Sequence, residues 1–130
     1  MKINSKTTSL STYEVRKIVN LTIKWCQSRL GVNNRRRQKF SVSIVKFGPA
    51  MGEFDFKRNT VIIYYGNNPS VKDIVKTTIH EYTHYLQSRT KYKEYEKFYY
   101  YSNHPCEREA RRNEEKYTDM CIKEIKKYLL

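Results

Sequence analysis

The segment His80-Glu81-Tyr82-Thr83-His84 constrains the fold of this 130-residue chain more than any other segment. On an α-helix, residues four positions apart lie on the same face, so the two imidazoles are placed to bind one metal ion. Glu81 lies about 100° further round the helix, where its carboxylate can take a proton from a metal-bound water without binding the metal. The HExxH spacing therefore predicts a helix that carries a catalytic zinc site.

The residues around this motif predict a half-buried helix. Residues 67–70 are typical of a turn, and Ser70 followed by Asp73 resembles a capping box. A stripe of mainly apolar residues then recurs at spacings of three and four; it consists of Val71, Ile74, Val75, Thr78, Ile79, Tyr82, Tyr85 and Leu86. The two histidines lie along one edge of this stripe. We therefore expect one side of the helix to pack against a core and the other side to bind the metal.

A catalytic zinc ion takes three protein ligands and leaves a fourth position for water, so a third ligand is expected downstream. Asn103 or His104 is placed to cap a second helix, with Pro105 in its first turn. An apolar face continues this helix; it consists of Ala110, Tyr117, Met120, Cys121, Ile125 and Tyr128. Glu107 lies one turn before the small residue Ala110, where two helices can approach closely, and is predicted to point towards the neighbouring helix.

Together these two segments resemble the zincin metallopeptidases, specifically the gluzincin pattern, in which HExxH is followed by a helix with a glutamate ligand. The resemblance implies one zinc ion bound by His80, His84 and Glu107. The second helix of that pattern often reads E-x-x-A-[DN], and here Arg111 stands where Asp or Asn is usual. The partner that orients the histidines is therefore left open. Alternative third ligands also stay open, and these are first Glu109, then His104 and Cys106.

Three segments before HExxH predict the strands of a small sheet. Residues 40–47, 54–56 and 60–65 have the composition of strands, and residues 57–59 form a short turn typical of a hairpin. The small ImmA/IrrE-like and SprT-like zincins are similar, with a helix, a small antiparallel sheet, the HExxH helix and a ligand-bearing helix. In them the strand before HExxH is commonly the sheet edge that pairs with an extended substrate. The resemblance implies this role for Val61, Ile62, Ile63, Tyr64 and Tyr65; the alternative is a strand that only buries the HExxH helix.

The remainder of the chain predicts one α+β domain over residues 1–130, with a minimal zincin fold. Residues 11–30 predict the first helix, capped by Ser11 or Thr12 and ended by Gly31. Residues 1–9 are short and polar and are expected to be poorly ordered.

Several features predict an intracellular, cytoplasmic protein. No apolar run is long enough to cross a membrane, and the polar N-terminus lacks the apolar core of a signal peptide. Cys26, Cys106 and Cys121 show no C-x-x-C spacing, so reduced thiols are expected. Abundant Lys, Asn, Tyr and Ile suggest an AT-rich source such as a phage, a plasmid or an organelle.

The charge of the chain is strongly basic and unevenly distributed. Its 26 basic and 13 acidic residues give a net charge of +13. The segment 35–39 concentrates positive charge, and we expect Arg35, Arg36, Arg37 and Lys39 to bind a polyanion. Nucleic acid, an anionic membrane surface or an acidic protein fits this expectation, and binding would weaken with salt. The alternative is a solvated loop that only aids solubility.

Tyrosines crowd the second half of the chain, above all in residues 88–102, which link the two ligand helices. We expect this segment to border a cleft, with one tyrosine hydroxyl placed to stabilise an oxyanion. The alternative for each tyrosine is aromatic packing. These observations favour a zinc-dependent metalloendopeptidase that acts on a protein or peptide, with Glu81 as general base. Two alternatives are a basic zinc protein associated with nucleic acid and a catalytically inactive zincin that acts as a binding module.

Overall fold

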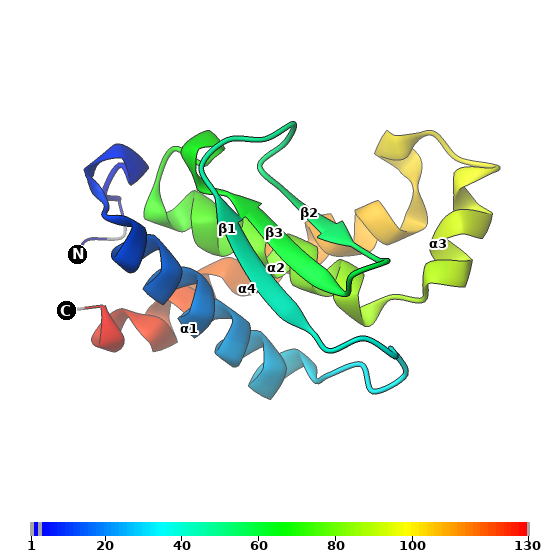
Figure 1. The fold of residues 1–130 in the computed structure, drawn as a ribbon, viewed down its shortest axis with the longest axis horizontal. Coiled ribbons are helices and arrows are strands. Elements are labelled where there is room, and N and C mark those ends of the chain that lie inside the picture. Colours follow the sequence, from blue (N-terminus) through cyan, green and yellow to red (C-terminus); the bar gives the residue numbers. More distant parts are fainter. Residues whose placement is uncertain (1, 3, 130) are drawn as a thin grey trace.

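The computed structural model describes residue 2 and residues 4–129. Within these residues it has four α-helices and a three-stranded sheet, which confirms the predicted α+β class (Figure 1). The helices are α1 (Thr12–Leu30), α2 (Val71–Leu86), α3 (Arg89–Glu96) and α4 (Pro105–Ile125). The strands are β1 (Ser41–Val45), β2 (Gly52–Asp55) and β3 (Thr60–Tyr64). No helix among the described residues has the length and apolar character needed to span a membrane.

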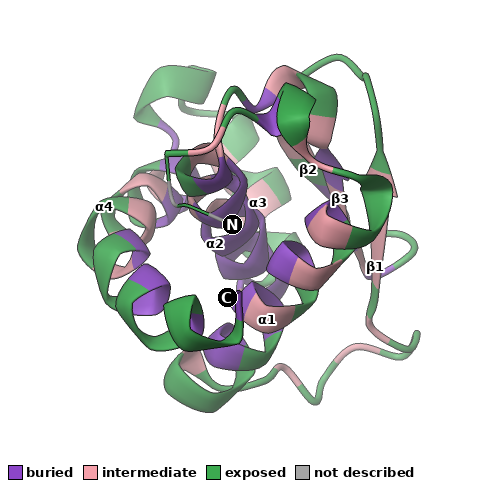
Figure 2. Ribbon diagram, turned by 90° about the vertical axis from the view of Figure 1, so that its left-hand side faces the viewer, coloured by how far each residue is buried: buried purple, intermediate pink, exposed green. Residues whose placement is uncertain are grey.

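The HExxH helix α2 is the central element of the fold. Ser70 caps it as predicted, because its hydroxyl accepts a hydrogen bond from the Asp73 amide at 3.3 Å. The apolar stripe is fully buried at Val71, Ile74, Val75, Ile79 and Tyr82. Figure 2 shows why, since α2 lies between the sheet on one side and α4 on the other, with α1 beside it. A helix covered on several sides is held rigidly, and this suits a scaffold for a metal site.

The sheet has the strand order β1-β3-β2, which corrects two predictions. First, β1 pairs parallel with β3, so the sheet is mixed rather than antiparallel. Second, β3 lies in the centre and is paired on both sides, so Val61, Ile62, Ile63 and Tyr64 do not form a free edge. Tyr65 lies beyond the strand, in a single 3-10 turn.

The physical reason for this order is the apolar character of β3. Val61 and Ile63 are fully buried, and a strand of that kind is most stable when both its edges and its faces are covered. The turn at 57–59, where Asn59 has φ +50°, allows only an antiparallel β2–β3 hairpin. The other edge of β3 is then left for β1. The outer edge of β2 remains free of any strand among the described residues.

Part of the N-terminal segment predicted to be poorly ordered is in fact packed. The Thr7 amide donates to the Pro69 carbonyl at 3.0 Å, and the Val71 amide donates to the Ser5 carbonyl at 3.1 Å. Lys6 and Ser70 form an isolated bridge. These contacts hold residues 5–7 against the start of α2, whereas Met1 and Ile3 lie outside the described residues.

The two flanking helices begin at the predicted residues. Ser11 caps α1 through a complete capping box with Glu14, and His104 caps α4 through its ring, with Pro105 at the first helical position. Trp25 is buried, and its indole nitrogen donates to Glu124 of α4. This hydrogen bond, together with apolar packing, joins α1 to α4.

Candidate metal centre

The facing sides of α2 and α4 bring together the three predicted zinc ligands. Glu107 is almost completely buried, and its Oε1 lies 2.7 Å from His84 Nε2 while its Oε2 lies 3.2 Å from His80 Nε2. Ala110, one turn further along α4, is fully buried and lets the two helices approach. We refer to His80, His84 and Glu107 as the metal centre. The spacing of two histidines on one helix and one glutamate on another places three ligand groups around a single point.

Gln87 fixes the orientation of the His84 ring. The Gln87 Nε2 group donates to the Cys106 carbonyl at 2.9 Å and to Glu109 Oε1 at 2.8 Å. Its Oε1 must therefore face His84 Nδ1, which lies 2.7 Å away and can only donate to it. Because Nδ1 donates to Gln87, Nε2 is the ring nitrogen that faces Glu107 and the one left to bind a metal.

Glu114 fixes the His80 ring in the same way. Its Oε1 lies 3.2 Å from His80 Nδ1, and because a carboxylate accepts, Nδ1 carries the proton. The Nε2 atom is then left to face Glu107. Sequence analysis left this orienting partner open because Arg111 stands at the position where Asp or Asn is usual. Arg111 instead donates to the Ser102 carbonyl at 2.5 Å, and Glu114, one helical turn later on α4, lies beside His80.

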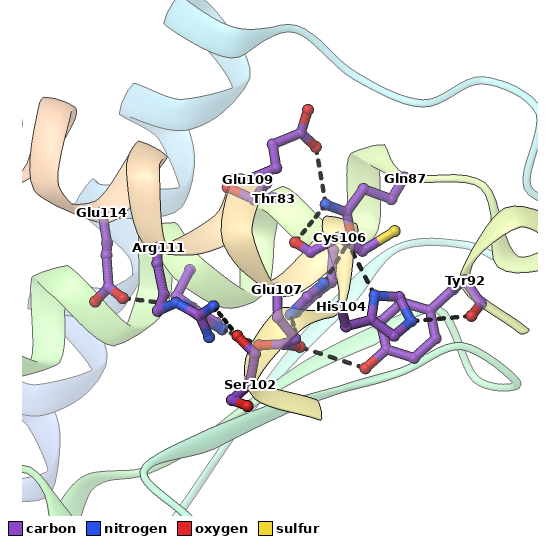
Figure 3. A network of polar contacts seen from close by, with 12 residues as sticks. Thr83, Gln87, Tyr92, Ser102, His104, Cys106, Glu107, Glu109, Arg111 and Glu114 are labelled. Atoms are coloured by element: carbon purple, nitrogen blue, oxygen red, sulfur yellow. Dashed lines mark hydrogen bonds and ion pairs between the residues drawn. The ribbon is translucent and has the colours of Figure 1, made fainter. Parts of the chain in front are cut away.

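The structure places the alternative third ligands away from the two histidine Nε2 atoms. Glu109 is exposed on α4 and accepts from Gln87, so it supports the residue that orients His84 (Figure 3). His104 uses both ring nitrogens, because Nδ1 accepts from the Cys106 amide at 3.1 Å and Nε2 donates to the Tyr92 carbonyl at 3.0 Å. Cys106 is a buried free thiol, and burial raises its pKa, which disfavours the thiolate that binds metal.

The electrostatics of the metal centre favour a positive charge between the ligands. Burial alone would raise the pKa of Glu107, but hydrogen bonds with His80 and His84 hold it far below its usual range. Burial would lower the pKa of His80, but hydrogen bonds with Glu107 and Glu114 raise it to about 10. The site is therefore an anionic carboxylate facing two rings, an arrangement that stabilises a cation.

Glu81 lies beside the metal centre without joining the hydrogen bonds of the ligands. Ligand atoms of His80, Glu81 and His84 all lie within 4.8 Å of one another. Glu81 is buried, and burial raises its pKa to about 7 against the opposing effect of the two histidines. A carboxylate whose pKa lies near neutrality is suited to accept a proton and to release it again.

Strand β2 passes directly over Glu81, and only glycine fits at the crossing. A Cβ atom on Gly52 would lie 2.7 Å from Thr77 Cγ2 and 3.1 Å from Glu81 Cγ. Both distances are shorter than ordinary van der Waals contact. Sequence analysis did not single out Gly52, because its role depends on how close β2 comes to α2. The glycine keeps the free edge of the sheet next to Glu81.

Two tyrosines border the metal centre. Tyr92 of α3 donates its hydroxyl to Glu107 Oε1 at 3.3 Å, and burial together with Glu107 raises its pKa (Figure 3). Burial and the Glu107 carboxylate also raise the pKa of Tyr101 to about 12. Both hydroxyls therefore keep their protons at neutral pH and are able to donate. Sequence analysis predicted a tyrosine at the site without saying which one.

A cleft of about 320 Å³ runs between β2 and α3. Glu53, Phe54 and Asp55 of β2 form one wall, and Tyr92 is part of the other. Tyr92 also donates its hydroxyl to Glu107, so one wall of the cleft contacts the metal centre. A substrate that lay along the free edge of β2 would therefore be held near Glu81.

Arg36, one of the predicted polyanion-binding residues, makes structural contacts that the sequence did not predict. Its Nε donates to the Tyr85 carbonyl at 3.0 Å, and its Nη2 donates to the Gln87 carbonyl at 2.8 Å. Its guanidinium carbon also lies 4.8 Å from the centre of the Phe54 ring. Arg36 thus caps the C-terminal end of α2, next to His84. The other predicted polyanion-binding residues, Arg35, Arg37 and Lys39, are exposed.

Comparisons of the chain with models of known protein families, with curated proteins and with solved structures found no match.

Proposed function

We propose that this protein is a zinc-dependent metallopeptidase of the zincin type. The observation that carries the proposal is the convergence of His80 Nε2, His84 Nε2 and the Glu107 carboxylate, with both Nδ1 atoms held by acceptors. Two oriented imidazoles and one carboxylate are a donor set that zinc takes in catalytic sites, where a fourth position stays open for water. The hydrogen bonds of the two rings to Gln87 and Glu114 support a metal site, since partners of this kind orient metal ligands.

The residues of the chain supply the steps of peptide hydrolysis. A bound zinc ion would activate water and polarise the scissile carbonyl. Glu81, with a pKa raised to about 7, accepts a proton from the attacking water and passes it to the leaving nitrogen. Tyr92 and Tyr101 keep their phenolic protons at neutral pH, and either hydroxyl would donate to the developing oxyanion once it turns away from Glu107.

The free edge of β2 supports a peptide as the substrate. Within the described residues no strand pairs with β2 on the side that faces the cleft, so an extended peptide could add there as a further strand. Gly52 brings this edge over Glu81. The substrate-binding strand that the resemblance implied is thus reassigned from the central β3 to the edge strand β2.

The variant Glu81→Gln tests this proposal. We expect it to bind zinc like the wild type and to lose at least about a hundredfold in the rate of cleavage of an unfolded, fluorescently labelled casein, because no base remains for the proton. Treating the wild type with 1,10-phenanthroline should abolish cleavage, and adding zinc back should restore it. Undiminished cleavage by Glu81→Gln would contradict the mechanism.

A further inference from the structure

A second, larger hollow of about 870 Å³ lies at the C-terminal end of α2. Its wall is formed by residues 32–38, the β2–β3 turn and the start of α3. Five of the lining residues are cationic and none is acidic; the cationic residues are Arg35, Arg36, Arg37, Lys57 and Arg89. We refer to this feature as the basic hollow.

Most of the positive charge of the basic hollow is available to a ligand. Arg36 is engaged with backbone carbonyls, but the other four cationic residues are exposed. None of these four forms an ion pair within the part of the chain that the structure describes. Arg89 is the first residue of α3, whose first turn contains no acidic residue. The partial positive charge of that helix end adds to the cationic side chains, so the hollow attracts anions.

The basic hollow is continuous with the cleft beside the metal centre. Phe56, Lys57 and Arg89 line both. The cleft itself contains both signs of charge, because its walls also carry the carboxylates of Glu53, Asp55 and Glu96. The cleft therefore has mixed charge, whereas the residues that line the basic hollow carry positive charge only.

We propose that the basic hollow binds acidic side chains of the substrate, so that this protein cleaves peptides next to an acidic segment. The proposal rests on the peptidase function proposed above and assigns its substrate class. A peptide paired with the free edge of β2 would continue past Phe56 and Lys57 into the hollow. Alternate side chains of such a strand lie about 7 Å apart on one face, which lets two or three carboxylates reach the arginines and Lys57.

Nucleic acid fits these observations less well than an acidic peptide. A strand of nucleic acid is bound along an extended positive track, with stacking of its bases. Here the cationic residues converge on the basic hollow. The adjoining cleft between β2 and α3 carries Glu53, Asp55 and Glu96, which would repel phosphates. An extended peptide can meet both regions by placing acidic residues in one and neutral or basic residues in the other.

Binding to the zinc-loaded Glu81→Gln protein tests the proposal independently of turnover. The probes are a fluorescein-labelled peptide with several glutamates, the same peptide with glutamines in their place, and a labelled single-stranded oligonucleotide. Two charge-reversed variants, Lys57→Glu with Arg89→Glu and Arg35→Glu with Arg37→Glu, are compared with a control of equal charge change. The control is Arg16→Glu with Lys24→Glu, two exposed residues of α1 outside the hollow.

We expect the acidic peptide to bind on the order of tenfold more tightly than the glutamine peptide, because several partly exposed ion pairs act together. Both charge-reversed variants should lose this preference, and the α1 control should keep most of it. Equal binding of the two peptides, no binding of either, or a preference that survives charge reversal would overturn the proposal. Tighter binding of the oligonucleotide, lost on charge reversal, would overturn it in favour of nucleic acid.

Cleavage by the wild type separates this inference from the function on which it rests. Equal cleavage of the acidic and glutamine peptides would refute the acidic preference and leave the peptidase intact. Tight binding of the acidic peptide by Glu81→Gln, without cleavage of any substrate by the wild type, would refute the peptidase and leave an acidic-peptide site.

Discussion

At the scale of single residues, the metal centre depends on two side chains that hold no metal themselves. His84 and His80 both present Nε2 to Glu107 because Gln87 Oε1 and Glu114 Oε1 occupy the two Nδ1 atoms. Gln87 is itself fixed by Glu109 and by the Cys106 carbonyl, both of which can only accept. The orientation of each ring is thus set by groups whose donor and acceptor roles leave one arrangement.

We predict that Gln87→Leu weakens zinc binding by roughly 10- to 100-fold, since it removes the acceptor that orients His84. Competition for zinc with a chromophoric chelator measures this change. The matched control is Glu109→Gln, which keeps an acceptor opposite Gln87 and should change the zinc affinity much less. Wild-type affinity in Gln87→Leu would show that His84 is oriented without Gln87.

The sequence predicted that His80, His84 and Glu107 lie together, but it did not predict the residues that orient them. His80, Glu81 and His84 follow from spacing on one helix, and Glu107 from its place before Ala110. Gln87 was noticeable only as a polar residue one turn after His84, and Glu114 only as one of several acids on α4. Their roles depend on how α2 and α4 cross, and local sequence does not encode that crossing.

At the scale of elements, the end of α2 is held by a residue from a distant loop. Arg36 donates to the carbonyls of Tyr85 and Gln87 and lies over the Phe54 ring of β2. Its contacts therefore connect the loop between α1 and β1 with the HExxH helix α2 and the edge strand β2. A guanidinium suits this position because its planar group donates several hydrogen bonds while stacking on an aromatic ring.

We predict that Arg36→Ala lowers the free energy of unfolding by about 1–3 kcal/mol, because buried carbonyls lose their donor and Phe54 loses a packing partner. Urea denaturation followed by circular dichroism measures the loss. Arg35→Ala and Arg37→Ala, at exposed neighbours, should stay within about 0.5 kcal/mol of the wild type. Equal effects of all three substitutions would argue against this cap.

The accuracy of the sequence predictions differs between helices and sheet for a physical reason. The starts of α1, α2 and α4 were predicted because Ser11, Ser70 and His104 act within one turn of their helices. The antiparallel sheet was implied by the resemblance to small zincins, and the sequence itself indicated only the hairpin around residues 57–59. Parallel pairing of β1 with β3 is a non-local choice that covers the apolar β3 on both edges, and neither strand shows it on its own.

At the scale of the whole molecule, the metal centre joins the two helices that the fold packs against each other. His80 and His84 come from α2 and Glu107 from α4, so a bound ion would cross-link elements that are separated in the unfolded chain. Ligands that bind the folded state alone stabilise it by mass action. The stability of the protein and the occupancy of the metal centre should therefore change together.

We predict that zinc raises the midpoint of thermal unfolding and that a chelator lowers it. Free zinc at about a hundred times Kd would stabilise the folded state by about 2.7 kcal/mol, which corresponds to a shift on the order of 10 °C for a domain of this size. Differential scanning fluorimetry measures the shift. His84→Ala should show almost none, and a full shift in that variant would place the bound zinc elsewhere.

The zinc content of the untagged protein tests the central claim most directly. Elemental analysis after incubation with zinc and dialysis should give one zinc per chain in the wild type and in Glu109→Ala, and close to none in His84→Ala and Glu107→Ala. Absence of zinc from the wild type would contradict the metal centre itself. Zinc retained in Glu107→Ala but lost in Glu109→Ala would contradict the third ligand assigned to it.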